Sequence, residues 1–257
     1  MSELMLQQTQ VARVAPRYEG FLSRFPDPAV CAAAPVGDVV RAWAGLGYTR
    51  RAVHLHRAAT EVVDRYGGAL PDRLDALLAL PGVGRYTARA VLAFAFDADV
   101  GVVETNTARV LARAFAGCRL PSPAAAQRLA DGAVPRARAW AWNQAMMDLG
   151  ATVCTSRAPA CGACPVRPWC LWAADGFPPP DPVKGSAGTG RPQAAFPGSD
   201  RQGRGRLVDA LCRGPVPLDG VAAAAGWPGA PERARRVADA LVSEGLAVTD
   251  GGHLRLP

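Results

Sequence analysis

The sequence contains no run of about 18 or more apolar residues, the length that a membrane-spanning helix needs. Its first ten residues, MSELMLQQTQ, lack both the basic region and the apolar region of a secretory signal. These two absences predict a soluble protein of the cytoplasm. Aromatic residues make up only 7% of the 257 residues, but 49% are hydrophobic, so the chain can form one large or two modest cores.

Acidic residues are in the minority, with 22 Asp and Glu against 29 Lys and Arg, and the net charge is +7. A positive excess favours association with a polyanion such as nucleic acid, although it carries no information about the fold. The seven cysteines are an odd number in a chain without an export signal, so a disulfide framework is not expected.

Helical periodicity without sustained alternation extends from Leu4 to about Ala174 and predicts an all-α region. Breaks rich in Pro and Gly divide it into roughly seven to nine helices. Residues 176–205 hold so much Pro, Gly and Ser that we expect a flexible linker. Residues 206–257 predict three short helices followed by a hairpin around Asp-Gly-Gly, which is the pattern of a winged-helix-like module.

Four cysteines follow the spacing C-x6-C-x2-C-x5-C near the end of the helical region. Four thiolates this close in sequence can surround one soft metal centre, either zinc or an iron-sulfur cluster. Zinc sites usually present two close pairs separated by a longer arm, so the uneven spacing favours a four-iron four-sulfur cluster. The alternative is four unrelated buried thiols. The proposed ligands are Cys154, Cys161, Cys164 and Cys170.

The segment LPGVGRYTA at 80–88 joins an amphipathic run to a second predicted helix. A turn at Gly82, Val83 and Gly84 exposes backbone N–H groups at the start of that helix, where a phosphate can bind, and Arg85 adds positive charge. Such a turn grips the backbone of a nucleic acid without reading its sequence. The alternative is an ordinary turn between two helices.

The hairpin, a carboxylate some twenty residues later at Glu104 and the cysteine spacing together resemble the helix-hairpin-helix DNA glycosylases of the endonuclease III superfamily. SELMLQQTQV at 2–11, GLGYTRRAVHLHRAA at 45–59 and NQAMMDLGATVC at 143–154 resemble its adenine DNA glycosylase branch. The resemblance implies a six-helix domain at 1–99, an iron-sulfur helical domain at 100–175, the linker at 176–205 and the winged-helix-like module at 206–257. It also implies that DNA binds between the first two domains.

The resemblance further implies a base-excision repair enzyme that hydrolyses the N-glycosidic bond of adenine opposite 8-oxoguanine or guanine in double-stranded DNA. Such chemistry needs an acid that protonates the flipped purine and an anion beside the sugar. Glu3 matches the acid, and an apolar enclosure from Leu4, Met5 and Leu6 is expected to raise its pKa. Glu104 matches the second carboxylate, for which the family uses the shorter Asp.

The remaining matches define the rest of the expected site. Tyr86 stands where bifunctional lyases of the superfamily carry a Schiff-base Lys, so we expect a monofunctional enzyme, acting as a monomer at the nucleoid. Relatives carry residues upstream of the first motif, which leaves two alternatives open: Met1 is a misassigned start, or Glu3 lies at a fraying terminus. The resemblance assigns Asn106 to the leaving purine, Tyr86 to support of the second carboxylate, Gln8 and Tyr48 to a wedge that fills the gap left by the flipped base, Thr9 and Leu46 to the opposite purine, and Asp148 to the floor of the adenine pocket.

Several alternatives stay open. Without the resemblance, Gln8 and Thr9 are ordinary helix polar residues, Tyr48 is a core residue and the stretch around Arg50, Arg51 and Arg57 is a solvated basic face. The best-known relatives end in a Nudix-like domain that recognises 8-oxoguanine, and residues 206–257 are too short for that fold. The competing functions are excision of another base, such as thymine opposite guanine, and a non-catalytic DNA-binding iron-sulfur protein.

Overall fold

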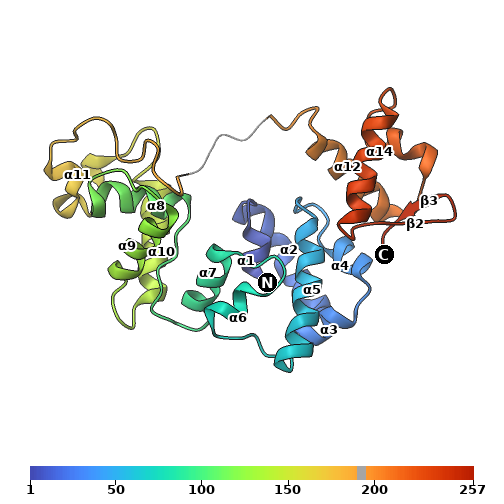
Figure 1. Cartoon of the computed structure of the whole chain (residues 1–257), viewed down its shortest axis with the longest axis horizontal. Coiled ribbons are helices and arrows are strands. Elements are labelled where there is room, and N and C mark those ends of the chain that lie inside the picture. Colours follow the sequence, from blue (N-terminus) through green and yellow to red (C-terminus); the bar gives the residue numbers. More distant parts are fainter. Residues whose placement is uncertain (190–194) are drawn as a thin grey trace. The chain divides into compact units, whose positions relative to one another are not determined.

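The computed structural model describes residues 1–189 and 195–257 (Figure 1). It divides into two compact units. The terminal unit consists of Met1–Pro71, Ala76–Val83 and the described residues from 195 onward. The central unit consists of Asp72–Asp75 and the described residues from Gly84 to 189. Within these ranges no helix is both long and apolar enough to cross a membrane.

The terminal unit begins with short helices that pack around Trp43, whose side chain is completely buried. Phe21 meets the Trp43 ring edge-on, with 5.9 Å between ring centroids. Asp27 caps one of these helices by accepting a hydrogen bond from the Val30 N–H at 2.8 Å. The helices are α1 (Ser2–Leu6), α2 (Val11–Arg24), α3 (Pro28–Ala33), α4 (Val36–Ala42), α5 (Arg50–Tyr66) and α6 (Leu74–Leu78). Only the part of α6 from Ala76 onward belongs to this unit.

The C-terminal part of the terminal unit has the predicted winged-helix order, with helices followed by a hairpin. Three antiparallel strands pair in the order β1-β3-β2, and Leu254 of β3 lies opposite both Val216 and Thr249. The first helix begins at Asp200, inside the segment expected to be linker, because Ser199 caps it through the Gln202 N–H. The elements are α12 (Asp200–Arg213), β1 (Val216–Pro217), η4 (Leu218–Gly220), α13 (Val221–Ala224), α14 (Pro231–Ser243), β2 (Val248–Asp250) and β3 (His253–Arg255).

This C-terminal part shares one hydrophobic core with the N-terminal helices. Leu207 and Leu241 belong to the same buried cluster as Val39. The Gly37 N–H at the start of α4 donates to the carbonyl oxygen of Pro257 at 3.1 Å, and a Cβ at Gly37 would stand 2.6 Å from that oxygen. The winged-helix part is therefore packed onto α4, a contact that nothing in its own sequence indicates.

The central unit is built around the crossing of α8 and α10. Gly150 makes the crossing possible, because a Cβ there would stand 2.5 Å from the backbone oxygen of Asn106. Helix α8 continues directly into a π-helical turn, η1, which ends at Gly117 with φ of 64°. The elements are α7 (Arg85–Ala95), α8 (Thr105–Val110), η1 (Leu111–Ala116), α9 (Pro123–Ala133), α10 (Ala139–Thr152), η2 (Cys161–Ala163), η3 (Arg167–Trp169) and α11 (Leu171–Ala174).

Residues 177–189, here called the strap, do not form the flexible linker that was predicted over 176–205. The strap packs on the central unit: Asp181 pairs with buried Arg113, and the Leu120 N–H donates to Ser186 Oγ at 2.8 Å. Composition indicated a linker because the strap has little apolar surface, yet polar pairs hold it in place. Residues 190–194 of the predicted linker lie outside the described residues.

Candidate functional site

The two predicted wedge residues are surface side chains on strained backbone. Gln8 and Tyr48 have φ of 54° and 46°, a conformation that is unfavourable for residues other than glycine. Gln8 follows α1 and Tyr48 precedes α5, so each lies on a turn next to a helix end. The Tyr48 side chain is 42% exposed, which contradicts the alternative reading of Tyr48 as a core residue.

Thr9 and Leu46 connect these two turns from the inside. Thr9 is buried and its Oγ1 donates to the carbonyl oxygen of Leu46 at 3.2 Å, while the Leu46 side chain is part of the core. The expectation that these two residues lie near the opposite purine stays a prediction. In this structure they join the Gln8 turn to the Tyr48 turn.

The interpretation of Arg51 as part of a solvated basic face is wrong, because Arg51 is buried. Its exposed fraction is 6%, and its guanidinium lies 2.9 Å from Thr9 Oγ1. Burial lowers the pKa of Arg51 to about 10, so the group stays charged at neutral pH. Its neighbours Arg50 and Arg57 are exposed, as expected.

Glu3, the predicted acid, lies on α1 beside core residues. Leu4 and Met5 are buried, and Oε2 of Glu3 is shielded from solvent. The role of Glu3 as the acid stays a prediction.

The predicted phosphate-binding turn is held against helix α5. Gly82 has φ of 77°, and a Cβ there would stand 2.7 Å from Cβ of His54, so both the backbone and the space require glycine. Gln7 Nε2 donates to the Gly82 oxygen at 3.3 Å, and the Val83 N–H closes the turn onto the Leu80 oxygen. Gly84 and Arg85, which start α7, are exposed.

Glu104 caps helix α8 with the carboxylate that the resemblance assigns to catalysis. Its Oε1 accepts from the N–H groups of Asn106 at 2.8 Å and Thr107 at 2.9 Å, and Thr107 Oγ1 accepts from the Glu104 N–H in return. The helix end favours negative charge at this position. The two hydrogen bonds show that Glu104 caps the helix through Oε1, and its catalytic role stays a prediction. Tyr86 on α7 packs near Val102, two residues before Glu104.

Arg109 is a residue that sequence reasoning missed. It is buried and its Nη2 donates to Oδ1 of Asn106 at 2.7 Å and to the oxygen of Gly150 at 2.6 Å, while its Nε donates to the oxygen of Cys154 at 3.2 Å. It therefore orients Asn106 and links it to residues 154–170, the segment that contains the four cysteines and is here called the cysteine loop. The sequence feature that could have indicated this contact is the spacing of Asn106 and Arg109, three residues apart on one helix.

Asp148 is exposed on α10, and its carboxylate accepts a hydrogen bond from Gln144 at 3.3 Å.

All four predicted cysteine ligands line one hollow. Four thiolates around one zinc ion would stand roughly 4 Å apart, given a Zn–S bond of about 2.3 Å. In the part of the chain that the structure describes, no group of three or more such side chains is arranged to hold a single metal ion. Four cysteine thiolates are the donor set of an iron-sulfur cluster, and the assignment of this cofactor stays a prediction.

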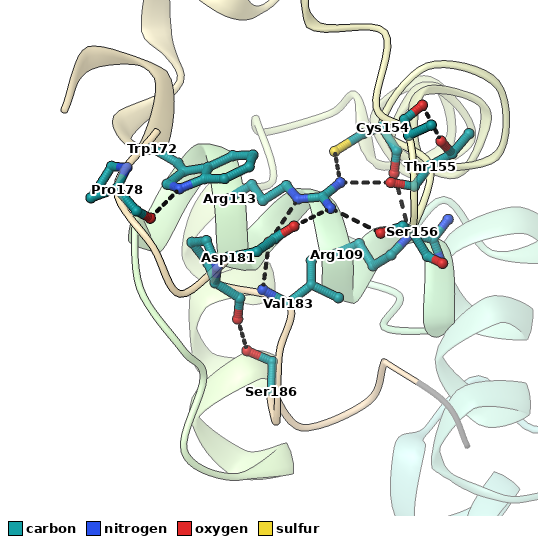
Figure 2. Close-up of polar contacts among 12 residues, drawn as sticks. Arg109, Arg113, Cys154, Thr155, Ser156, Trp172, Pro178, Asp181, Val183 and Ser186 are labelled. Atoms are coloured by element: carbon teal, nitrogen blue, oxygen red, sulfur yellow. Dashed lines mark hydrogen bonds and ion pairs between the residues drawn. The ribbon is translucent and has the colours of Figure 1, made fainter. Parts of the chain in front are cut away.

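Arg113 ties the cysteine loop to the strap (Figure 2). It donates to the oxygen of Thr155 at 2.7 Å, approaches Cys154 Sγ at 3.5 Å and pairs with both carboxylate oxygens of Asp181 at 3.0 and 2.6 Å. Its guanidinium also stacks on Trp172, 5.3 Å from the ring centroid. Burial lowers the pKa of Arg113, but its hydrogen bonds to Asp181 and Cys154 outweigh that effect and the net pKa is raised.

Comparison with known proteins identifies the family. Residues 1–136 match the model described as HhH-GPD superfamily base excision DNA repair protein. The chain belongs to the HhH-GPD superfamily. The match includes Glu3, the 80–84 turn and Glu104 with α8, and it ends before the cysteine loop.

Individual members of the HhH-GPD superfamily extend the match. The adenine DNA glycosylase of Mycobacterium tuberculosis is 41% identical over 100% of this chain and 84% of its own length. The human adenine DNA glycosylase is 45% identical over 66% of this chain and 32% of its own length. Among solved structures, a thermostable thymine-DNA glycosylase aligns with a TM-score of 0.61 and 27% identity, covering 68% of this chain and 82% of that one.

Proposed function

We propose that this protein is a monofunctional DNA glycosylase of base excision repair that hydrolyses the N-glycosidic bond of adenine. The observation that carries the proposal is the contrast between two carboxylates. Glu3 has an oxygen shielded from solvent, which suits a proton donor, and Glu104 has an oxygen fixed by two backbone N–H groups, which suits an anion. Full-length similarity to an adenine DNA glycosylase supports the same conclusion.

In the proposed reaction, Glu3 protonates the adenine ring so that the purine leaves as a neutral base. Positive charge then develops on the sugar, and the Glu104 carboxylate stabilises it electrostatically before water adds. We assign Asn106 to hydrogen bonding near the leaving purine, and the bond that its Oδ1 accepts from Arg109 supports a fixed orientation of its side chain. Glu104 is one methylene longer than the family Asp, and its extended backbone at the helix cap, with φ of −132° and ψ of −177°, sets where the carboxylate stands.

Two observations support hydrolysis without strand cleavage. Tyr86 occupies the position at which lyases of the superfamily have a Schiff-base Lys, and the chain contains a single lysine, Lys184, on the strap. A covalent intermediate with the sugar requires an amine at the site. The expected product is therefore an intact strand with an abasic site.

The finer substrate assignment is adenine opposite 8-oxoguanine or guanine in double-stranded DNA, with the protein acting as a monomer at the nucleoid. Gln8 and Tyr48 supply the wedge, Thr9 and Leu46 lie toward the opposite purine, Gly82, Val83, Gly84 and Arg85 hold a phosphate, and Asp148 closes the adenine pocket. We assign Cys154, Cys161, Cys164 and Cys170 as ligands of a four-iron four-sulfur cluster. A cluster held by these four thiolates would supply no chemistry to the base and would order the loop that carries Arg157 and Arg167.

The test is base release under single-turnover conditions from duplexes with adenine opposite 8-oxoguanine or guanine, read as strand breaks with and without hot alkali. We expect breaks at adenine only after alkali. Glu3→Gln, which keeps shape but cannot donate the proton, should slow release by about a hundredfold or more. Glu104→Gln should also slow it, and Glu104→Asp tests whether this site is matched to the longer side chain. Breaks without alkali would contradict the monofunctional assignment.

A second candidate is excision of thymine opposite guanine, which the structural similarity to a thymine-DNA glycosylase favours. The same assay with a thymine–guanine duplex separates the two. Release of thymine but not adenine would replace the first proposal. Tight duplex binding without release of either base would show a non-catalytic role.

A further inference from the structure

We propose that Arg51 is a positioning residue that holds the Gln8 turn and the Tyr48 turn as one rigid body, so that both side chains enter the base stack together. The inference rests on the proposed function, because it concerns how the wedge is presented to DNA. It does not require Arg51 to touch DNA.

The hydrogen bonds of Arg51 divide between the two turns. Its Nη1 donates to backbone oxygens before and after the end of α1, at 2.6 to 2.8 Å. Its Nη2 donates to Thr9 Oγ1 and, at 3.0 Å, to the oxygen of Gly47, and its Nε donates to the oxygen of Tyr48 at 3.3 Å. One side chain thus spans both turns. The seven acceptors are the backbone oxygens of Leu4, Met5, Gln7, Leu46, Gly47 and Tyr48, and Oγ1 of Thr9.

The positions of these bonds match the positions of the strained residues. Gln8 has a positive φ and stands between two residues that Arg51 holds, Gln7 and Thr9. Tyr48 also has a positive φ, and Arg51 holds its carbonyl oxygen. A residue keeps such a conformation only where its surroundings over-determine it. Arg51 therefore bonds residues at both strained positions.

Arginine suits this role for reasons of donor number and charge. Its five N–H groups lie in one rigid plane, whereas lysine offers three donors on a single nitrogen. The guanidinium stacks on Trp43 at 5.2 Å and beneath Tyr48 at 5.5 Å, which fixes its plane between the turns. With an exposed fraction of 6% it cannot reach a phosphate, unlike exposed Arg50.

The experiment compares the full chain with Arg51→Met, Arg51→Lys and a matched control, Arg13→Met. Arg13 is an exposed arginine on α2 that donates to the oxygen of Gly45, in the same turn as Tyr48, at 2.9 Å. Three quantities are measured: amide hydrogen exchange of residues 4–9 and 44–50 without DNA, fluorescence of 2-aminopurine placed at the adenine position, and the single-turnover rate of adenine release.

For Arg51→Met we expect faster exchange in both turns and a loss of about tenfold or more in base extrusion and adenine release. Affinity for undamaged duplex, measured separately as a control, should change by less than about threefold, since buried Arg51 is not proposed to contact phosphate. Arg51→Lys should stay within about threefold of Arg51→Met, because charge without the planar fork does not bridge the turns. Arg13→Met should stay within about twofold of the unaltered protein.

The proposal is overturned if exchange in the two turns is unchanged in Arg51→Met, or if the turns loosen while 2-aminopurine extrusion is unaffected. Wild-type behaviour of Arg51→Lys would overturn it in favour of a simple charge effect. If Arg51→Met does not fold, Arg51→Lys carries the same three measurements. If the unaltered protein releases no base, the proposed function fails, while exchange and extrusion still decide the role of Arg51.

Discussion

Two buried arginines organise two parts of this protein in opposite ways. In the part of the chain that the structure describes, every hydrogen-bond acceptor of Arg51 is an uncharged oxygen. Arg113 instead pairs with a carboxylate, Asp181, which lies 68 residues away in the sequence. Burial accordingly lowers the pKa of Arg51, whereas the bonds to Asp181 and Cys154 raise that of Arg113.

The difference shows what each kind of contact provides. The oxygens that Arg51 bonds belong to residues 4–9 and 46–48, so this side chain joins two turns of the terminal unit. Arg113 bonds the backbone oxygens of Thr155 and Ser156 as well as the carboxylate of Asp181, so it joins the strap to the cysteine loop (Figure 2). The first arrangement is insensitive to mild acid, and the second depends on the ionisation of Asp181.

The largest expected effect is that of Arg51→Met on the terminal unit. Several buried oxygens lose their donor at once, and we expect the free energy of unfolding to fall by about 3 kcal/mol. Urea unfolding followed by hydrogen exchange should show the loss in residues 1–66 and none in residues 154–189. A loss of stability confined to the central unit would contradict the assignment of Arg51 and Arg113 to separate parts of the protein.

Arg113→Met should come next, with a loss of about 2 kcal/mol that is limited to the central unit. We expect faster amide hydrogen exchange in residues 154–160 and in the strap. The fluorescence of Trp172 should also change, because the cation stacked on its ring is removed. Iron content after purification reports whether the cysteine loop still assembles a cluster. An unchanged strap would show that Asp181 does not need Arg113.

Asp181→Asn should cost about 1 kcal/mol near neutral pH, since Asp181 is 34% exposed and solvent screens the pair. Burial alone raises the pKa of Asp181, but the bonds from Arg113 and the Val183 N–H outweigh it, and the net pKa is lowered. The contribution is therefore complete above the ordinary Asp pKa and disappears as the pH falls through the lowered value. Stability measured from pH 7 down to acid should fall less steeply in Asp181→Asn than in the unaltered protein.

The smallest effect should come from Arg65→Gln, an exposed arginine on α5 that pairs with Glu61 at 3.3 Å. Exposed pairs four residues apart on a helix contribute about 0.3–0.5 kcal/mol, and added salt should remove the difference. This variant measures how much of the loss in the buried variants is due to charge alone. A loss as large as that of Arg113→Met would remove the distinction between buried and exposed arginines.

The linear patterns of the sequence were sufficient for much of the molecule. The HhH-GPD membership, the helical fold and the winged-helix order with its Asp-Gly-Gly hairpin were all predicted and are confirmed. The roles assigned to Glu3, Glu104 and the cysteines remain predictions. The strap was predicted wrongly, because composition measures apolar content and takes no account of an ion pair between Arg113 and Asp181.

The sequence by itself determined which segments form helices and where the tight turns fall, because periodicity and glycine positions are local properties. Only the tertiary structure decided that Arg51 is buried and Arg50 is not, and that Asp181 returns to Arg113. It also decided that the winged-helix part shares a core with α4. Burial and pairing depend on residues far apart in the chain, and no local pattern records which of them will meet.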